Sequence, residues 1–249
     1  MVVAATEAWG TIGGGNLEAT AISRARDLLA DGAFTPTMIH QDLTEHAAGE
    51  FGRQCCGGSS TVLLEPLPVP ASVAIFGMGH VGRELARLLS RHDLDLHLVD
   101  GRPGFAVPSA LPALDDALAH IRWHEGPWPD PVLAHLPGGT HVLVMTHDHA
   151  EDAALCDAAL RAPVRSRPAS VGLIGSRAKW RRIEKALREL GHPPESTARI
   201  TCPIGDPGVP GKDPASIALS VAVDLLRRIA EPPTVPDPRG LPLRHGDRP

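Results

Sequence analysis

Residues Ser72 to Gly82 read SVAIFGMGHVG, and this stretch decides the fold. Its apolar start is typical of a buried strand, and the strand leads into the pattern GxGxxG formed by Gly77, Gly79 and Gly82. The next apolar run, LDLHLVD, ends at Asp100. Glycines in this arrangement permit a tight turn and the close approach of a pyrophosphate, which the following helix attracts. The pattern predicts a Rossmann-like turn with these four residues as candidate nucleotide ligands; a turn that binds no nucleotide is the alternative.

The chain beyond this turn alternates between strands and helices. Strands are predicted at 94–100, 121–124, 141–145 and 170–174, and helices at 80–90, 149–160, 177–190 and 213–230. Such alternation is typical of a parallel, doubly wound sheet with helices on both faces. The fold class is therefore α/β, with a Rossmann-like doubly wound parallel sheet.

A proline-rich connector divides the chain. Prolines at alternate positions in LEPLPVPA favour an extended spacer, placed at 67–71. Residues 1–66 before it form a smaller α/β domain, with a helix at 17–29 capped by Asn16 and a strand at 60–65. The Rossmann-like domain spans 72–230, and the polar, Pro-rich residues 231–249 are expected to be a disordered tail.

Composition excludes several classes of protein. The 249 residues carry a net charge of -5, which argues against a nucleic-acid partner. No signal peptide and no membrane-length apolar run is present, so we expect a soluble, cytoplasmic protein with no membrane partner. The four cysteines make no CxxC, so their spacing predicts neither a disulfide framework nor a structural zinc site.

The pair Cys55 and Cys56 lies in the segment QCCGG, Gln54 to Gly58. Two neighbouring cysteines in an extended segment cannot both point into one core, so one thiol is expected to be exposed, with glycines that allow close approach. An exposed thiolate suits a soft metal or a sulfur-transfer centre. Cys156, among alanines and leucines of a predicted helix, is interpreted as a core residue, and Cys202 is open to either interpretation.

Two further turns are candidate anion sites. Gly13, Gly14 and Gly15 precede the first helix, and their backbone N–H groups can form a nest; a plain flexible turn is the alternative. Ser176, Arg177 and Lys179 begin a later helix. Cations are unfavourable at that end of a helix unless an anion joins them, so a phosphate is one explanation and a solvated basic face is the other.

A polar cluster, His147, Asp148 and His149, follows the strand at 141–145, with Asp152 one turn later. Ligands often bind at the carboxyl ends of parallel strands, and a polar site of this kind is the favoured interpretation. The HxH pair also suggests a metal-dependent hydrolase. However, the aspartate and histidine that would follow in a metallo-β-lactamase pattern are replaced by Glu151 and Asp152.

Taken in order, these motifs resemble the XdhC/CoxI family of xanthine dehydrogenase accessory proteins. The matching segments span the chain to about residue 230 and are GTIGGGNLE, QCCGG with TVLLEP, FGMGHVG, THDHAED, GLIGSRAK and CPIG with DPASIALSVAVDLL. The resemblance implies a small N-terminal domain that bears the cysteines and a C-terminal Rossmann-like domain. The family's further N-terminal segment, with a GSxPR-like stretch, is not found before Met1, so the first domain is expected to be truncated by a late start or a real loss.

The resemblance also implies a function. Members bind the molybdenum cofactor (molybdopterin), hold it while a cysteine desulfurase replaces an oxo ligand by sulfur, and deliver it to a molybdenum hydroxylase such as xanthine dehydrogenase. Carried over to this chain, Cys56 is the first candidate for contact with molybdenum and Cys55 the second. Beyond the family pattern, we infer that the turn Gly13 to Gly15 and the helix start at Ser176, Arg177 and Lys179 are candidates for the pterin phosphate. A homodimer is also implied.

Two other functions compete with this one. An NAD(P)-dependent oxidoreductase would use Gly77, Gly79, Gly82 and Asp100, with His147 or His149 as the acid–base group. A metal-dependent hydrolase would use the HxH motif. The leading interpretation is a maturation factor without catalytic turnover.

Overall fold

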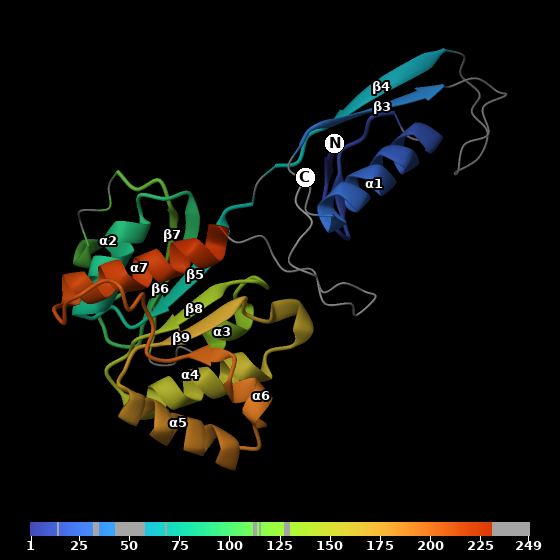
Figure 1. Ribbon diagram of the computed structural model, residues 1–249. Helices are drawn as coiled ribbons and strands as arrows, with labels where there is room; N and C mark the ends of the chain where they lie inside the picture. The colour runs from blue at the N-terminus through green and yellow to red at the C-terminus, as the bar shows by residue number, and fades with distance from the viewer. Residues whose placement is uncertain are drawn as a thin grey trace. The chain divides into compact units, whose positions relative to one another are not determined.

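The computed structural model describes residues 1–13, 15–31, 35–42, 58–67, 69–111, 114, 116–126 and 130–230 (Figure 1). The chain divides into two compact units, Met1–Val69 and Pro70–Pro249. The division lies inside the proline-rich connector at 67–71. Each unit is described by itself.

The first unit combines one helix with two short antiparallel pairs of strands. Its elements are β1 (Val2–Val3), β2 (Ala8–Trp9), α1 (Gly15–Ala30), β3 (Thr37–Asp42) and β4 (Ser59–Leu64). β1 pairs with β2, and β3 pairs with β4. The alternating burial along β3 and β4 shows that one face of this ribbon is more covered than the other.

The second unit is built on a six-stranded sheet in which every pair is parallel, in the order β10-β9-β8-β5-β6-β7. Its strands are β5 (Ala71–Phe76), β6 (Leu94–Asp100), β7 (His120–Glu125), β8 (His141–Val144), β9 (Ser170–Leu173) and β10 (Ile200–Thr201). The central strand β5 is buried over Val73–Phe76, as expected for a parallel strand covered on both faces.

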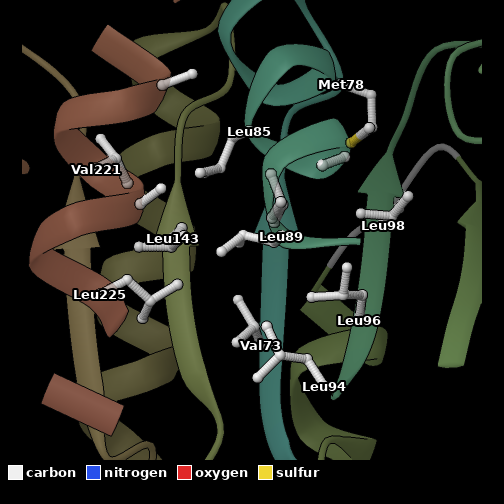
Figure 2. Close-up of a cluster of buried hydrophobic side chains, with 14 of the residues drawn as sticks. Val73, Met78, Leu85, Leu89, Leu94, Leu96, Leu98, Leu143, Val221 and Leu225 are labelled. Carbon is white, nitrogen blue, oxygen red and sulfur yellow. The ribbon is translucent and has the colours of Figure 1, made fainter. Parts of the chain in front are cut away.

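Helices cover both faces of this sheet (Figure 1). α2 (His80–Leu89) and α7 (Pro214–Ala230) pack on one face. Figure 2 shows this layer, where aliphatic side chains of both helices meet those of the sheet: Leu85, Leu89, Val221, Leu225, Val73 and Leu143. The other face carries α3 (Asp130–His135), α4 (His149–Arg161) and α5 (Arg177–Glu189). The described part of the unit also contains the short helix α6 (Pro194–Thr197) and the 3₁₀ turns η1 (Pro108–Ala110) and η3 (Val164–Ser166).

The predicted fold class is confirmed, because the observed sheet is parallel, doubly wound and flanked by helices. The main corrections concern element ends. α1 begins at Gly15, so Asn16 lies within its first turn and does not precede it. α7 begins at Pro214, with Asp213 before it: the Ser216 N–H donates to Asp213 Oδ1 at 3.0 Å. No helix of the described residues is long and apolar enough to cross a membrane.

Candidate functional site at the switch point of the sheet

The order of the strands places the two most conspicuous motifs side by side. β5 pairs with β6 on one side and with β8 on the other, so the chain reverses its direction of winding at β5. In open α/β sheets, ligands bind at the carboxyl ends of the strands beside such a switch point. The glycine turn follows β5, and Thr146 to Asp148 follow β8.

The three glycines of the turn differ in what a side chain at each position would contact. Gly77 has φ +112°, and a Cβ there would lie 2.4 Å from the Met145 carbonyl oxygen. A Cβ on Gly82 would lie 2.1 Å from the Gly77 carbonyl oxygen. Both positions therefore need glycine for packing within the domain. A Cβ on Gly79 would meet no atom of the described residues within 4 Å, so within this part of the chain the glycine faces open space.

The N-terminus of α2 has no side-chain cap. Gly79 is its N-cap residue, and among the side chains that the structure describes none accepts a hydrogen bond from the first turn. The first N–H groups of a helix need acceptors from outside the helix, and they attract anions. The open space at Gly79 lies at the same end of α2. This end of the helix therefore fits a phosphate group.

Asp100, at the end of β6, accepts hydrogen bonds from the chain itself. Its Oδ2 accepts from the Met78 N–H at 2.7 Å and from Arg102 Nη2 at 2.7 Å. Its Oδ1 accepts from the Arg102 N–H and from Arg102 Nε, both at 2.9 Å. Burial alone would raise the pKa of the Asp100 carboxyl, but these hydrogen bonds outweigh it and hold the pKa below its ordinary value.

Arg102 is held on a second side by an aromatic ring. Its guanidinium carbon lies 3.8 Å from the centre of the Phe105 ring, and that of Arg83 lies 5.0 Å from the same centre. Arg83 Nε also donates to the Met78 carbonyl at 3.1 Å. The glycine turn is thus tied to the segment after β6 through Asp100, Arg102 and Phe105.

The cluster after β8 is partly used to start α4. Asp148 is the N-cap residue, and its Oδ1 accepts from the Ala150 N–H at 2.6 Å and the Glu151 N–H at 3.2 Å. These bonds lower the pKa of Asp148. His147 and His149 are exposed. The three predicted residues therefore lie at the switch point, with Asp148 in a capping role.

Asp152 is fully buried, and it holds residues next to this cluster in place through its contacts. Its Oδ1 accepts from the Thr146 hydroxyl at 2.8 Å, and its Oδ2 contacts Lys179 Nζ. Within the described parts of the chain, no three His, Cys, Asp or Glu side chains come together where they could hold a metal ion. Asp152 is thus paired with Thr146 and Lys179 of the chain itself.

At the start of α5, one of the two predicted cations, Lys179, has a negative partner from within the protein. Lys179 Nζ contacts Asp152 and donates to the Ile174 carbonyl at 3.0 Å. The Ser176 hydroxyl accepts from the Lys179 N–H at 3.2 Å and caps the helix. Arg177 is exposed. The suggestion that Ser176, Arg177 and Lys179 receive a phosphate stays a prediction.

Donor groups of the turn before α1 also have acceptors within the protein. Glu18 Oε2 accepts from the Ile12 N–H at 3.1 Å and from the Thr11 hydroxyl. The Gly13 N–H donates to Thr11 Oγ1 at 3.1 Å. Gly13 and Gly15 have positive φ angles, which suits the predicted glycine turn. Gly14 lies outside the described residues, and phosphate binding by this turn stays a prediction.

The cysteines divide into two groups. Cys55 and Cys56 lie outside the described residues, so their predicted exposure and their role are untested. Cys156 is buried in the core between the sheet and α4, as predicted, and burial raises the pKa of its thiol to about 12. Cys202 is half-buried beside the same core, and burial raises its thiol pKa as well.

One residue of the site was missed by the sequence interpretation. Glu151 lies at the same edge of the sheet as Asp100 and Arg102, and its charge acts on both. The sequence signal was present: Asp148 and Glu151 have the spacing of a capping box, which marks a helix start and draws attention to both carboxylates.

Comparison with known proteins gives the same assignment as the motifs. A family model described as the XdhC Rossmann domain matches residues 73–225, more than half of the chain. A second model, described as the XdhC and CoxI family, matches residues 1–41. The chain belongs to the XdhC/CoxI family. The two matched ranges leave the QCCGG segment between them.

Two individual proteins illustrate the relationship. The uncharacterized protein YqeB of Escherichia coli (strain K12) is 26% identical over 219 residues, which are 88% of this chain; the chain spans 38% of the length of that relative. The crystal structure of a xanthine dehydrogenase from Bacillus halodurans superposes with a TM-score of 0.53 at 17% identity, covering 93% of this chain and 86% of that one. The second similarity supports the fold of this family member.

Proposed function

We propose that this family member is an accessory protein that binds the molybdenum cofactor during maturation of xanthine dehydrogenase or a related molybdenum hydroxylase. The observation that carries the proposal is membership of the XdhC/CoxI family over both units, with the Cys55–Cys56 pair between the matched ranges. The similar Bacillus halodurans protein, described as a xanthine dehydrogenase, points to the same enzyme system.

The residues present fit the chemistry of this cofactor. Molybdopterin combines a phosphate, a nitrogen-rich pterin ring and a dithiolene that binds molybdenum. The uncapped N-terminus of α2 and the open space at Gly79 suit the phosphate. A cysteine thiolate is a ligand type that suits a soft, sulfur-bound metal centre, and Cys56 is the candidate, with Cys55 second.

The protein's task in this proposal is to hold and protect rather than to catalyse. In the first unit, Cys56 is the candidate ligand of the metal centre; within the second unit taken by itself, the turn at Gly77 to Gly82 is a candidate for binding a phosphate group. When bound, the cofactor supplies the molybdenum at which an oxo ligand is exchanged for sulfur. A cysteine desulfurase as the sulfur donor, a molybdenum hydroxylase as the recipient, a homodimeric state and a cytoplasmic location are parts of the same proposal.

The glycine turn also supports a second candidate function, that of an NAD(P)-dependent oxidoreductase. The open space at Gly79 fits a pyrophosphate as well as a pterin phosphate. Hydride chemistry would need an acid–base group, and His147 and His149 at the end of β8 are the candidates.

The deciding experiment is anaerobic purification of the full chain from cells that make the cofactor. Molybdenum is measured by mass spectrometry, and pterin by fluorescence after oxidation. Wild type is expected to retain near-equimolar pterin and molybdenum, Cys56→Ala to lose most of both, and the control Cys202→Ala to resemble wild type. A wild type without pterin that binds NADH tightly refutes the proposal. Equal retention by Cys56→Ala refutes the role of Cys56.

A further inference from the structure

The exposed side of α5 carries a basic face, which is formed by Arg177, Arg181, Arg182, Lys185 and Arg188 (α5 in Figure 1). The opposite side of the helix holds Ile183 and Leu187 in the core. Along its 13 residues α5 has six basic side chains and two acidic ones, whereas the whole chain has a net charge of -5. Positive charge is therefore concentrated on this helix, in a chain that is otherwise acidic.

The arginines of the other helices have partners within the chain. Among the described residues, each arginine of α1, α2, α4 and α7 contacts a carboxylate or a carbonyl oxygen: Arg24, Arg26, Arg83, Arg87, Arg161, Arg227 and Arg228.

The basic face of α5 is only partly paired. Arg188 Nη2 lies 2.7 Å from Glu184 Oε1, and Lys185 Nζ lies 3.7 Å from Glu189 Oε1. For the side chains of Arg177, Arg181 and Arg182, no described residue supplies a counter-charge or an acceptor. These three differ in this respect from the arginines of every other described α-helix.

The unpaired charges are unfavourable for the helix itself. Arg181 lies four residues after Arg177 and four before Lys185, and like charges at this spacing repel each other on a helix surface. Arg177 also lies in the first turn, where the helix dipole disfavours a cation. Folding of the domain gives no reason for this arrangement, whereas a negative surface from outside the chain would remove both repulsions.

We propose that the basic face of α5 is a docking surface for a partner protein with an acidic patch. A guanidinium group binds a carboxylate through two parallel hydrogen bonds, so unpaired arginines suit a surface of Asp and Glu side chains. Arginine is also enriched in protein interfaces and among the residues that dominate their affinity. Leu190, which ends the helix and is 54% exposed, offers an apolar contact beside these charges.

Two other negatively charged partners fit this face less well. A nucleic acid extends far beyond a helix of 13 residues, and the acidic rest of the chain would repel its phosphates. A membrane-binding helix inserts its apolar side, but the apolar side of α5 is packed into the core through Ile183 and Leu187. An acidic patch of limited size on a protein meets neither obstacle.

The proposed function gives such a surface a use. A protein that delivers a cofactor must meet the recipient enzyme and leave it again, and complementary charge raises the rate of encounter more than it prolongs the complex. The inference rests on the proposed function only for the choice of the recipient enzyme as one probe. The surface itself is inferred from α5 alone.

The test is surface plasmon resonance with the full chain and two immobilised probes. One probe is xanthine dehydrogenase purified without its molybdenum cofactor, and the other is a synthetic peptide rich in Glu and Asp. The variant is Arg181→Gln/Arg182→Gln. Its control, Arg24→Gln/Arg87→Gln, removes the same charge from arginines of other helices whose side chains are 61% and 43% exposed.

The variant is expected to bind both probes about three- to thirtyfold more weakly than wild type, mainly through slower association, and to lose part of the salt dependence of binding. The control is expected to bind like wild type.

Urea unfolding separates docking from a structural role. Because Arg181 and Arg182 have no acceptor among the described residues, the variant is expected to unfold at the same urea concentration as wild type or a slightly higher one. A variant that is clearly less stable than wild type would show that these arginines serve the fold, and would overturn the docking role.

The binding outcomes distinguish this inference from the proposed function. A wild type that retains no pterin on purification refutes the proposed function, and binding of the acidic peptide then decides the inference. Equal binding of wild type and variant, or binding of wild type to neither probe, overturns the inference while the proposed function stands. An RNA homopolymer or anionic lipid vesicles that bind more tightly than both probes, through Arg181 and Arg182, would also overturn it.

Discussion

Lys179 and Asp152 form a largely buried ion pair: Lys179 Nζ contacts Asp152 Oδ2, and the two side chains are 13% and 0% exposed. The pair joins the start of α5 to the start of α4, and the Lys179 ammonium also donates to the Ile174 carbonyl. The Thr146 hydroxyl, in turn, donates to Asp152. The edge of the sheet beneath the candidate site is thereby connected from β8 to β9.

The first prediction concerns the stability that this pair provides. Lys179→Met leaves the Asp152 carboxylate buried without its partner, and a broken buried pair typically costs about 3–5 kcal/mol. Urea unfolding is expected to show a loss of that size in the free energy of unfolding. Lys185→Met is the matched control, because Lys185 lies on the same helix, is 78% exposed and is expected to change stability by less than about 0.5 kcal/mol. Equal unfolding midpoints for the two variants would contradict the buried role of Lys179.

The second prediction separates two glycines of the same turn. Gly82→Ala places a Cβ against the Gly77 carbonyl, a backbone atom that cannot move without the turn, and is expected to destabilise the domain by about 2–3 kcal/mol. Gly79→Ala meets no neighbour, and its φ of -75° is allowed for alanine, so it is expected to stay within about 1 kcal/mol of wild type.

Although Gly79→Ala is the milder change for stability, we expect it to impair ligand binding. Gly79→Ala fills the open space at the helix start and is expected to lower the pterin that copurifies while the melting temperature is retained. The measurements are thermal unfolding and the pterin content of the purified protein. A Gly79→Ala protein with full pterin content would show that the ligand does not approach α2 there.

The third prediction concerns acid stability. His97 Nδ1 and His124 Nε2, on the neighbouring strands β6 and β7, lie 3.0 Å apart in nearly parallel rings. One of these nitrogens must accept a hydrogen bond, so the contact is lost when both rings are protonated. Burial lowers the pKa of both histidines from the ordinary 6.5, with the charge of Arg122 acting in the same direction.

The sign of the pH effect follows from these shifts. The folded protein resists protonation that the unfolded chain accepts, so unfolded chains bind more protons as the pH falls through 6.5, and the free energy of unfolding decreases in that window. His124→Gln is expected to reduce this decrease between pH 7.5 and 5.5 on the order of one proton's linkage. His92→Gln, on an exposed turn, serves as the control, and identical pH profiles for wild type and His124→Gln would refute the prediction.

The core of the fold was predictable because its signals are local. The apolar run before Gly77 and the alternation that follows it predict β5, α2, β6, β8, α4, β9 and α5 within a few residues. β3 was missed because His40, Gln41 and Asp42 make half of it polar; its register depends on pairing with β4, more than 15 residues away in sequence. The two-residue strand β10 and the short helix α6 are too brief to carry a periodic pattern.

The sequence predicted the positions of the candidate site's motifs, but it did not predict which charged side chains contact other residues of the chain. The sequence placed anion sites at the turn before α1, at the glycine turn and at the start of α5. In each place a carboxylate of the chain itself accepts part of the donors: Glu18 accepts the Ile12 N–H, Asp100 the Met78 N–H, and Asp152 contacts the Lys179 ammonium. Whether a charged side chain meets a ligand or a partner within the chain depends on tertiary contacts, such as that between Asp152 and Lys179, which no local pattern specifies.

The hydrogen bonds of Asp100 have a thermodynamic consequence for any ligand. Because Asp100 holds Met78 and Arg102, the glycine turn keeps its shape before a ligand arrives. Fixing the backbone of a residue costs about 1–2 kcal/mol in conformational entropy, and here folding has already met that cost for the turn. A phosphate bound at this turn would therefore retain more of its interaction energy as affinity, and Asp100 would contribute to that binding by holding the turn in shape.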